Sequence, residues 1–122
     1  RVKLRDYANE LKRRQKVAGA YNEALLDKEL ILPFVKQGRD SVWAQYSIRV
    51  SDRDALQERL KNAGIPTAIH YPLPLHLQEC FSYLGYKSGD FPVAEAVSNE
   101  ILSLPMNGFL SDDEIRHVAA VL

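Results

Sequence analysis

The sequence of 122 residues has a single cysteine, no net charge and no long apolar run. Cys80 alone cannot form an internal disulfide, and such low cysteine content suits a reducing compartment, so we expect a cytoplasmic protein. Sixteen lysine and arginine residues balance sixteen aspartate and glutamate residues, which gives no electrostatic argument for a nucleic-acid partner. No apolar run approaches the roughly 20 residues that span a bilayer, so we expect no membrane partner either.

The composition is that of an ordinary globular protein. About half of the residues are hydrophobic (46%) and about a quarter are charged (26%), which excludes a disordered tail or a fibrous repeat. The length suits one compact domain. Because the sequence opens at Arg1, within a charged stretch that is typical of a helix and unlike a signal peptide, we expect a piece of a longer protein. Part of an active site would then lie outside these residues.

The first expected element is a long helix over residues 4–26. Steps of three and four residues place one stripe on a single helical face, formed by Leu4, Tyr7, Leu11, Arg14, Ala18, Tyr21 and Leu25. Arg14 is the charged exception in this stripe. Either its charge extends to solvent from a packed aliphatic stem, or it forms an ion pair with a domain outside this sequence.

Alternation of apolar and polar residues predicts a strand over residues 41–50. Its apolar row is Val42, Ala44, Tyr46, Ile48 and Val50, with Trp43 on the other face. Residues 65–70 can return as a short strand, and residues 101–105 are either a buried strand or the end of a helix. The sum is an α/β (α+β) fold, with a small sheet of about three strands covered by helices.

Capping residues indicate where the later helices begin. Ser51 followed by Asp54 is one candidate capping box, and Ser111 followed by Glu114 is another. Asp90 is the expected N-cap of a helix between them.

The chemistry-bearing residues gather in residues 64–81, which hold two of the three histidines, the single cysteine, a tyrosine and three prolines. Prolines stiffen a loop, and such a loop can present His70, Tyr71 and His76 to a ligand. The alternative is that these side chains only pack or cap backbone groups, and the residues alone leave the two interpretations evenly balanced.

Other kinds of site have little support. The spacing of His70, His76 and Cys80 is not a usual zinc pattern, and Cys80 is expected to be a small core residue. The sequence contains no G-x-S-x-G, P-loop or G-x-G-x-x-G motif. The residues therefore indicate a globular domain with a ligand-facing loop, without a metal site or a complete catalytic set.

Several ordered segments resemble the C-terminal end of the DegT/DnrJ/StrS sugar aminotransferases. They are SVWAQYSIRV, RDALQERLKNAGIPTAIHYPLPLHLQ and GDFPVAEAVSNEILSLPM, while the opening ELKRRQKVAGAYNEALL resembles that family's helix between its large and small domains. The resemblance covers essentially the whole chain. It implies a linking helix at residues 1–28 and a C-terminal small domain of the aspartate-aminotransferase fold (fold type I) at residues 29–122.

The resemblance implies a dimeric pyridoxal-phosphate enzyme for bacterial surface polysaccharide biosynthesis. An amino donor, usually glutamate, would supply the amino group for a keto group on a UDP-linked sugar, notably 2-acetamido-3-oxo-glucuronate. In this family the Schiff-base lysine and the cofactor-binding groups lie in the large domain. The resemblance therefore implies that this chain alone holds no catalytic or cofactor-binding residue and is inactive.

What the resemblance transfers to this chain is substrate contact. His70 and Tyr71 match a histidine–tyrosine pair near the sugar nucleotide, and His76 matches a second histidine of that loop. Ala44 departs from the family pattern, in which many members have histidine, so no substrate contact is assigned to its strand. The competing hypothesis is an autonomous α/β module that binds a small ligand or regulates; unlike a separated small domain, it would leave no apolar stripe exposed on its first helix.

Overall fold

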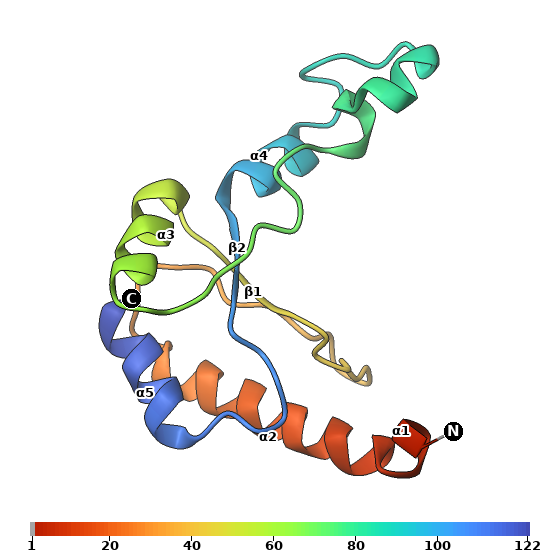
Figure 1. Cartoon of the computed structure of the whole chain (residues 1–122). Coiled ribbons are helices and arrows are strands. Elements are labelled where there is room, and N and C mark those ends of the chain that lie inside the picture. The colour runs from red at the N-terminus through yellow and green to blue at the C-terminus, as the bar shows by residue number, and fades with distance from the viewer. Residues whose placement is uncertain (1) are drawn as a thin grey trace.

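The computed structural model describes residues 2–122, so Arg1, the first residue of the expected linking segment, lies outside the described part. Figure 1 shows how the helices, strands and 3-10 turns (η) are arranged. In chain order they are α1 (Val2–Arg5), α2 (Tyr7–Ala24), β1 (Tyr46–Arg49), α3 (Arg53–Asn62), η1 (Leu75–Leu77), η2 (Glu79–Leu84), α4 (Pro92–Glu100), β2 (Ile101–Leu104) and α5 (Asp112–Val121). The α/β expectation is confirmed, and none of the described helices is long and apolar enough to cross a membrane.

The sheet has two antiparallel strands within the described residues, in place of the expected three. Single bridges flank it, Ile31 with Arg49 on one side and Ala68 with Ser103 on the other. Ala68 and Ser103 exchange both of their backbone hydrogen bonds. In that antiparallel register the next such pair would be Pro66 with Pro105, and neither proline has an N–H to donate. The prolines therefore stop the ladder on the Pro66 side of Ala68, and the segment 65–70 pairs with β2 at one bridge.

The expected strand at 41–50 forms only at residues 46–49. Val42 is 54% exposed and Ala44 is exposed, whereas Trp43, expected on the opposite face, is buried. Trp43 has a φ of 48°, a left-handed conformation that interrupts the alternation of an extended strand. Its indole Nε1 donates a hydrogen bond to Gln15 on α2 at 2.8 Å, which fixes the inward orientation.

The core lies between the sheet and the helices. Tyr21 of α2 stacks on Tyr46 of β1 with ring centroids 4.8 Å apart, and both rings are fully buried. The Tyr21 hydroxyl donates to the Pro105 carbonyl at 2.9 Å, and the Tyr46 hydroxyl donates to Asn22 Oδ1 at 2.6 Å. Burial raises the pKa of Tyr21 to about 12. Tyr46, a member of the expected apolar row, is thus a core residue, and its hydroxyl has a partner.

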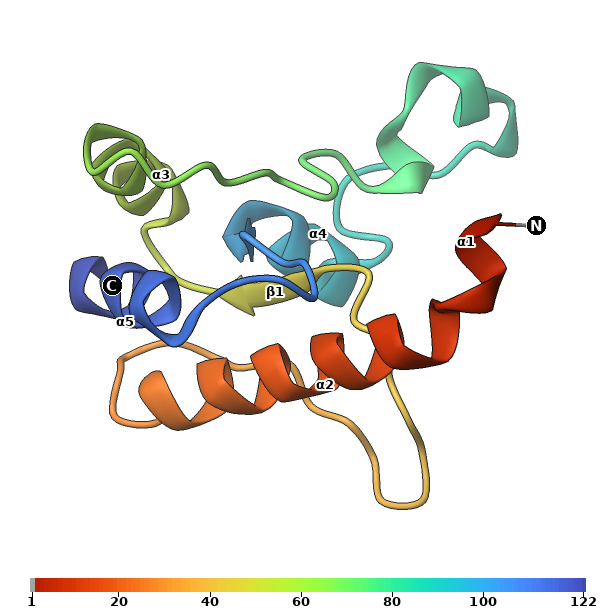
Figure 2. The ribbon, with the colours of Figure 1, turned by 60° about the horizontal axis from the view of Figure 1, so that its bottom comes forward.

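The N-terminal helical stripe is partly covered. Ala18, Tyr21 and Leu25 are fully buried, whereas Leu4 is 72% and Tyr7 48% exposed. The expected single helix is divided at Asp6 into α1 and α2, and α2 packs against α5, as Figure 2 shows.

Arg14 finds its partners within the chain. Its guanidinium forms an ion pair with Glu10 at 2.9 Å and donates to the Trp43 carbonyl at 3.0 Å. No second domain is needed to satisfy its charge.

One of the three expected helix caps is confirmed. Ser111 and Glu114 form a reciprocal capping box at the start of α5. At the start of α3 the expected box at Ser51 is wrong, because Asp52 is the N-cap and its carboxylate accepts from Ala55 N. Asp side chains cap helices as effectively as Ser, so a shift of one residue costs little.

A segment that we call the arm, residues 71–91, extends from α4 away from α2 and α5 (Figure 1). It contains both 3-10 turns, η1 and η2, which pack on each other. None of the fully buried core residues lies in the arm. The arm is therefore a surface structure that carries the candidate site.

Candidate functional site

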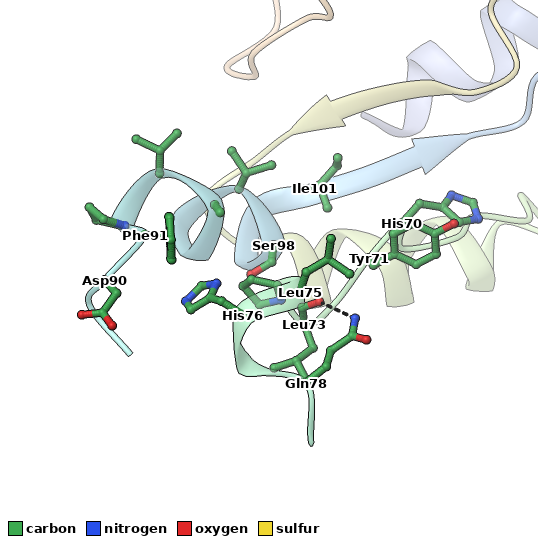
Figure 3. A pocket seen from close by; sticks show the side chains of 15 residues that line it. His70, Tyr71, Leu73, Leu75, His76, Gln78, Asp90, Phe91, Ser98 and Ile101 are labelled. Carbon is green, nitrogen blue, oxygen red and sulfur yellow. Dashed lines mark hydrogen bonds between the residues drawn. The ribbon is translucent and has the colours of Figure 1, made fainter. Parts of the chain in front are cut away.

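A cavity of about 820 Å³ lies between the first part of the arm and α4 (Figure 3). Its apolar lining includes Leu73, Leu75, Phe91, Val97 and Ile101. Its polar lining consists of His70, Tyr71, His76, Gln78, Asp90 and Ser98. The three residues singled out from the sequence thus border one cavity, with His70 and Tyr71 at one end and His76 beside Phe91 toward the other (Figure 3).

His70 is held by the sheet. It follows the bridge between Ala68 and β2, and its Nδ1 lies 3.0 Å from Ser103 Oγ. The ring of Tyr71 meets the ring of His70 edge to face, with centroids 5.6 Å apart. Because Tyr71 is 71% exposed, its hydroxyl is free to meet a ligand that enters from solvent.

His76 is held more closely than His70. Its side chain is only 8% exposed, and its Nε2 lies 3.0 Å from Glu95 Oε1. Its ring also contacts Phe91, with centroids 4.8 Å apart. One ring nitrogen of His76 is therefore already occupied, and only Nδ1 remains for a ligand.

Glu95 supports the cavity wall by holding His76, and no motif of the sequence singles it out. Besides His76, its carboxylate accepts hydrogen bonds from Gly89 N, Phe91 N and Ser88 Oγ, at distances from 2.9 to 3.3 Å. Burial favours the neutral acid, but these hydrogen bonds outweigh it, and the pKa of Glu95 lies below its ordinary value. An acidic residue in the first turn of α4 was the only signal available in the sequence.

This arrangement corrects the expected cap of α4. The N-cap is Phe91, and its side chain makes no capping bond. Asp90, the expected N-cap, instead accepts a hydrogen bond from Lys87 N at 2.9 Å within the arm. The Glu95 carboxylate accepts hydrogen bonds from Gly89 N and Phe91 N next to the start of the helix, so these groups do not need the Asp90 side chain.

His70, His76 and Cys80, the candidate zinc ligands of the sequence, do not come together in the structure. His70 contacts Ser103, His76 contacts Glu95, and Cys80 Sγ lies 3.8 Å from Gln78 Oε1. Cys80 is exposed, so its expected core position is wrong: it lies in the arm, outside the core. The described residues contain no cluster of three or more metal-ligating side chains.

The cavity lining also bears on the cofactor that the resemblance implies. Holding pyridoxal phosphate as a Schiff base requires a lysine at the site. No lysine is among the residues that line the cavity. These residues therefore do not fit the covalent attachment of the cofactor, although they can still face a substrate.

Fold and cavity together define a small α/β domain that presents a stiff, histidine-bearing loop beside an open cavity. The chain belongs to the DegT/DnrJ/EryC1/StrS aminotransferase family, whose family model matches residues 1–122.

Individual relatives agree with this membership. The chain is 42% identical, over its full length, to the erythromycin biosynthesis sensory transduction protein EryC1 of Saccharopolyspora erythraea, and covers 34% of it. It is 36% identical to the UDP-2-acetamido-2-deoxy-3-oxo-D-glucuronate aminotransferase of Pseudomonas aeruginosa, over 98% of this chain and 33% of the relative. The chain thus spans about a third of the length of these curated relatives.

A solved structure shows the same fold. The crystal structure of DesV from S. venezuelae in complex with a ketimine intermediate superposes with a TM-score of 0.95 at 30% identity, over 99% of this chain and 33% of that one. The two-stranded sheet and its helices are therefore an aminotransferase substructure.

Proposed function

We propose that this chain is the C-terminal, substrate-facing part of a pyridoxal-phosphate-dependent aminotransferase. The enzyme transfers an amino group, with glutamate as donor, to a keto group of a UDP-linked sugar. One observation carries the proposal: in a chain that matches the family over residues 1–122, His70, Tyr71 and His76 border one open cavity. The setting is bacterial surface polysaccharide biosynthesis in the cytoplasm.

His70 and Tyr71 are the direct substrate contacts in this proposal. Imidazole and phenol groups are hydrogen-bond donors suited to diphosphate and sugar oxygens. His70 is anchored through Nδ1, and Tyr71 is 71% exposed, so a polar substrate can reach both. His76 is the third substrate-side residue, and it contributes through Nδ1 because Glu95 occupies Nε2.

The cofactor lies outside this chain in the proposal. The absence of lysine from the cavity lining supports a Schiff-base lysine on a separate large domain, which residues 1–28 connect to the small domain at residues 29–122. The exposed side chains of Leu4 and Tyr7, at the start of the linking segment, support contact with that domain. The full-length enzyme is a homodimer in this proposal.

The sugar class is supported by one relative in particular. The Pseudomonas aeruginosa protein at 36% identity is named for UDP-2-acetamido-2-deoxy-3-oxo-D-glucuronate. We therefore propose a UDP-linked 3-oxo sugar as substrate, with 2-acetamido-3-oxo-glucuronate as the first compound to assay.

Separate half-reactions of the full-length enzyme test the proposal. His70→Ala or Tyr71→Phe should lower the efficiency of the sugar half-reaction about ten- to a hundredfold, since a hydrogen bond to a charged group contributes roughly 1.5–3 kcal/mol. The half-reaction with the amino donor should stay nearly unchanged. Stopped-flow absorbance follows each half-reaction.

The matched control is Tyr83→Phe, because Tyr83 is a 78% exposed tyrosine of the arm that does not line the cavity. It should leave both half-reactions unchanged. If His70→Ala and Tyr71→Phe slow both half-reactions equally, these residues support the fold or the cofactor site, and their role in substrate binding is wrong.

A further inference from the structure

A chain of three side chains crosses the sheet and ends at His70. Ser47 of β1 and Ser103 of β2 are direct cross-strand partners, and their Oγ atoms lie 2.8 Å apart. Ser103 Oγ lies 3.0 Å from His70 Nδ1. Ser103 is only 5% exposed, so water does not readily replace either contact.

The backbone of Ser103 holds the same segment independently. Ser103 N donates to the Ala68 carbonyl at 2.8 Å, and Ala68 N donates to the Ser103 carbonyl at 3.2 Å. The path of the chain to His70 is thus fixed by backbone bonds, whereas the Ser103 hydroxyl contacts the imidazole itself. Removing that hydroxyl separates the two roles.

The two nitrogens of His70 have different surroundings. Nδ1 faces Ser103, and among the described residues no hydrogen bond reaches Nε2. The ring borders the large cavity on the α4 side and a second cavity of about 320 Å³ that Ser103 and Ala44 also line. The nitrogen that remains for a ligand is therefore Nε2.

We propose that Ser103, supported by Ser47, is a positioning residue that holds His70 with Nε2 directed to the nucleotide-sugar substrate. This inference rests on the proposed function. A serine hydroxyl has one proton and two acceptor positions. When Ser47 donates to Ser103 and Ser103 donates to Nδ1, the proton of the neutral imidazole is on Nε2. His70 then donates a hydrogen bond, as diphosphate and sugar oxygens require.

The same pair explains why a serine is placed in the middle of a buried strand. Leu102 and Leu104 beside Ser103 are buried apolar residues, and a buried hydroxyl needs a partner to offset its lost hydration. Ser103 has two partners, Ser47 and His70. A Ser–Ser pair by itself uses only one of its two hydroxyl protons, and His70 Nδ1 is the acceptor within reach of the other.

The test uses the full-length enzyme with selectively ¹⁵N-labelled histidine and two variants, Ser103→Ala and Ser47→Ala. The ¹⁵N chemical shifts of His70 report which ring nitrogen carries the proton. In the parent enzyme the proton should be on Nε2. Ser103→Ala should give a mixture of the two tautomers and lower the sugar half-reaction about three- to tenfold, the effect of one neutral hydrogen bond, while the donor half-reaction is unchanged.

Ser47→Ala should produce a smaller change of the same kind, because Ser103 keeps its contact with Nδ1. Ser98→Ala, which removes another buried hydroxyl that donates to the Glu95 carbonyl, is the control for the ¹⁵N spectrum and should leave the His70 signals in place. An unaltered His70 tautomer in Ser103→Ala would overturn the proposal. The proposal would also be overturned if Ser103→Ala altered the tautomer without slowing the sugar half-reaction, provided that His70→Ala does slow that half-reaction.

Failure of the proposed function has a different signature. In that case His70→Ala itself leaves the sugar half-reaction intact, whatever the spectrum of Ser103→Ala shows. A circular dichroism melt of each variant distinguishes both results from unfolding, and Ser103→Thr, which restores a hydroxyl, should recover the parent tautomer.

Discussion

The Glu95 carboxylate lies 3.0 Å from His76 Nε2 and joins the two ends of the arm. His76 belongs to η1 in the first part of the arm, while the other donors to Glu95, among them Gly89 and Phe91, belong to its last residues. Since Glu95 is itself on α4, one side chain closes the arm at its base. The cavity wall formed by the arm therefore depends on a charged group that is not itself among the residues lining the cavity.

Glu95→Gln should loosen the arm and leave the core intact. The amide keeps the shape of the side chain, but it has one acceptor oxygen in place of two and no charge to strengthen the bonds. We expect the amide hydrogens of Gly89 and Phe91 to exchange at least about tenfold faster, with those of Ile48 and Leu102 unaffected. Hydrogen exchange read by mass spectrometry or NMR measures this.

Glu79→Gln is the matched control, because it makes the same change at an exposed position of the arm. Equal acceleration in both variants, or acceleration that extends to the strands, would contradict the role assigned to Glu95.

The arm should also open in acid. The pKa of Glu95 is lowered in the folded protein, so the unfolded or opened state binds more protons at low pH. The stabilisation is therefore complete above the ordinary pKa of the carboxyl and is lost as the pH falls through the lowered value. Exchange at Gly89 should rise in that window beyond its intrinsic pH trend, and Glu95→Gln should remove the additional rise. If exchange at Gly89 in the parent protein shows no additional rise in this window, protonation of Glu95 does not open the arm.

The helix caps offer a direct measurement of stability. Ser111→Ala should lower the free energy of unfolding by about 1 kcal/mol, because it removes the side chain that accepts from Glu114 N at the start of α5. Ser51→Ala is the control, since Ser51 is exposed and does not cap α3; it should stay within about 0.5 kcal/mol of the parent. Urea denaturation gives both values, and equal effects would contradict the capping assignment.

The chain by itself should not attach the cofactor. Residues 1–122, purified and mixed with pyridoxal phosphate, should give no saturable adduct that borohydride fixes at a single lysine, because no lysine borders the cavity. Absorbance and peptide mapping check this. A stoichiometric adduct at one lysine would place the cofactor site in this chain and overturn the proposed division between domains.

The isolated chain should self-associate through its uncovered apolar side chains. Leu4 and Tyr7 at the N-terminal end, and Leu75 and Val93 near the cavity, are between 48% and 75% exposed. Sedimentation velocity should show concentration-dependent association that Leu4→Glu weakens. A clean monomer that binds no apolar dye would instead support an autonomous module.

Periodicity predicted the parts of the fold in which one face is simply buried. Tyr21 in α2, Leu25 at the C-cap of that helix, and Tyr46 and Ile48 in β1 are all fully buried, as their stripe and their alternation indicate. Alternation failed at Trp43, because a positive φ at a residue other than glycine leaves no mark in the sequence. The short strand expected at 65–70 is stopped on one side by a pair of prolines, Pro66 and Pro105, whose opposition appears only once the register is known.

The candidate site was predictable in its residues but not in its supports. Histidines and prolines in one short segment indicate a ligand-facing loop, and His70 and Tyr71 do border a cavity. Ser103, which contacts His70, is 33 positions away from it along the chain. Glu95, which contacts His76, is 19 positions away from it. Contacts between residues so far apart depend on tertiary structure, which no local pattern encodes.

Both ends of the arm are attached to the same part of the molecule. It departs from the segment bridged to Ser103 and returns at Phe91, so both ends are fixed to α4 and β2, which form one continuous stretch. Since no fully buried core residue lies between these ends, insertions, deletions or wholesale replacement there leave the packing of Tyr21 and Tyr46 untouched. The sequence of this single surface loop can therefore change while the scaffold that carries it keeps its packing.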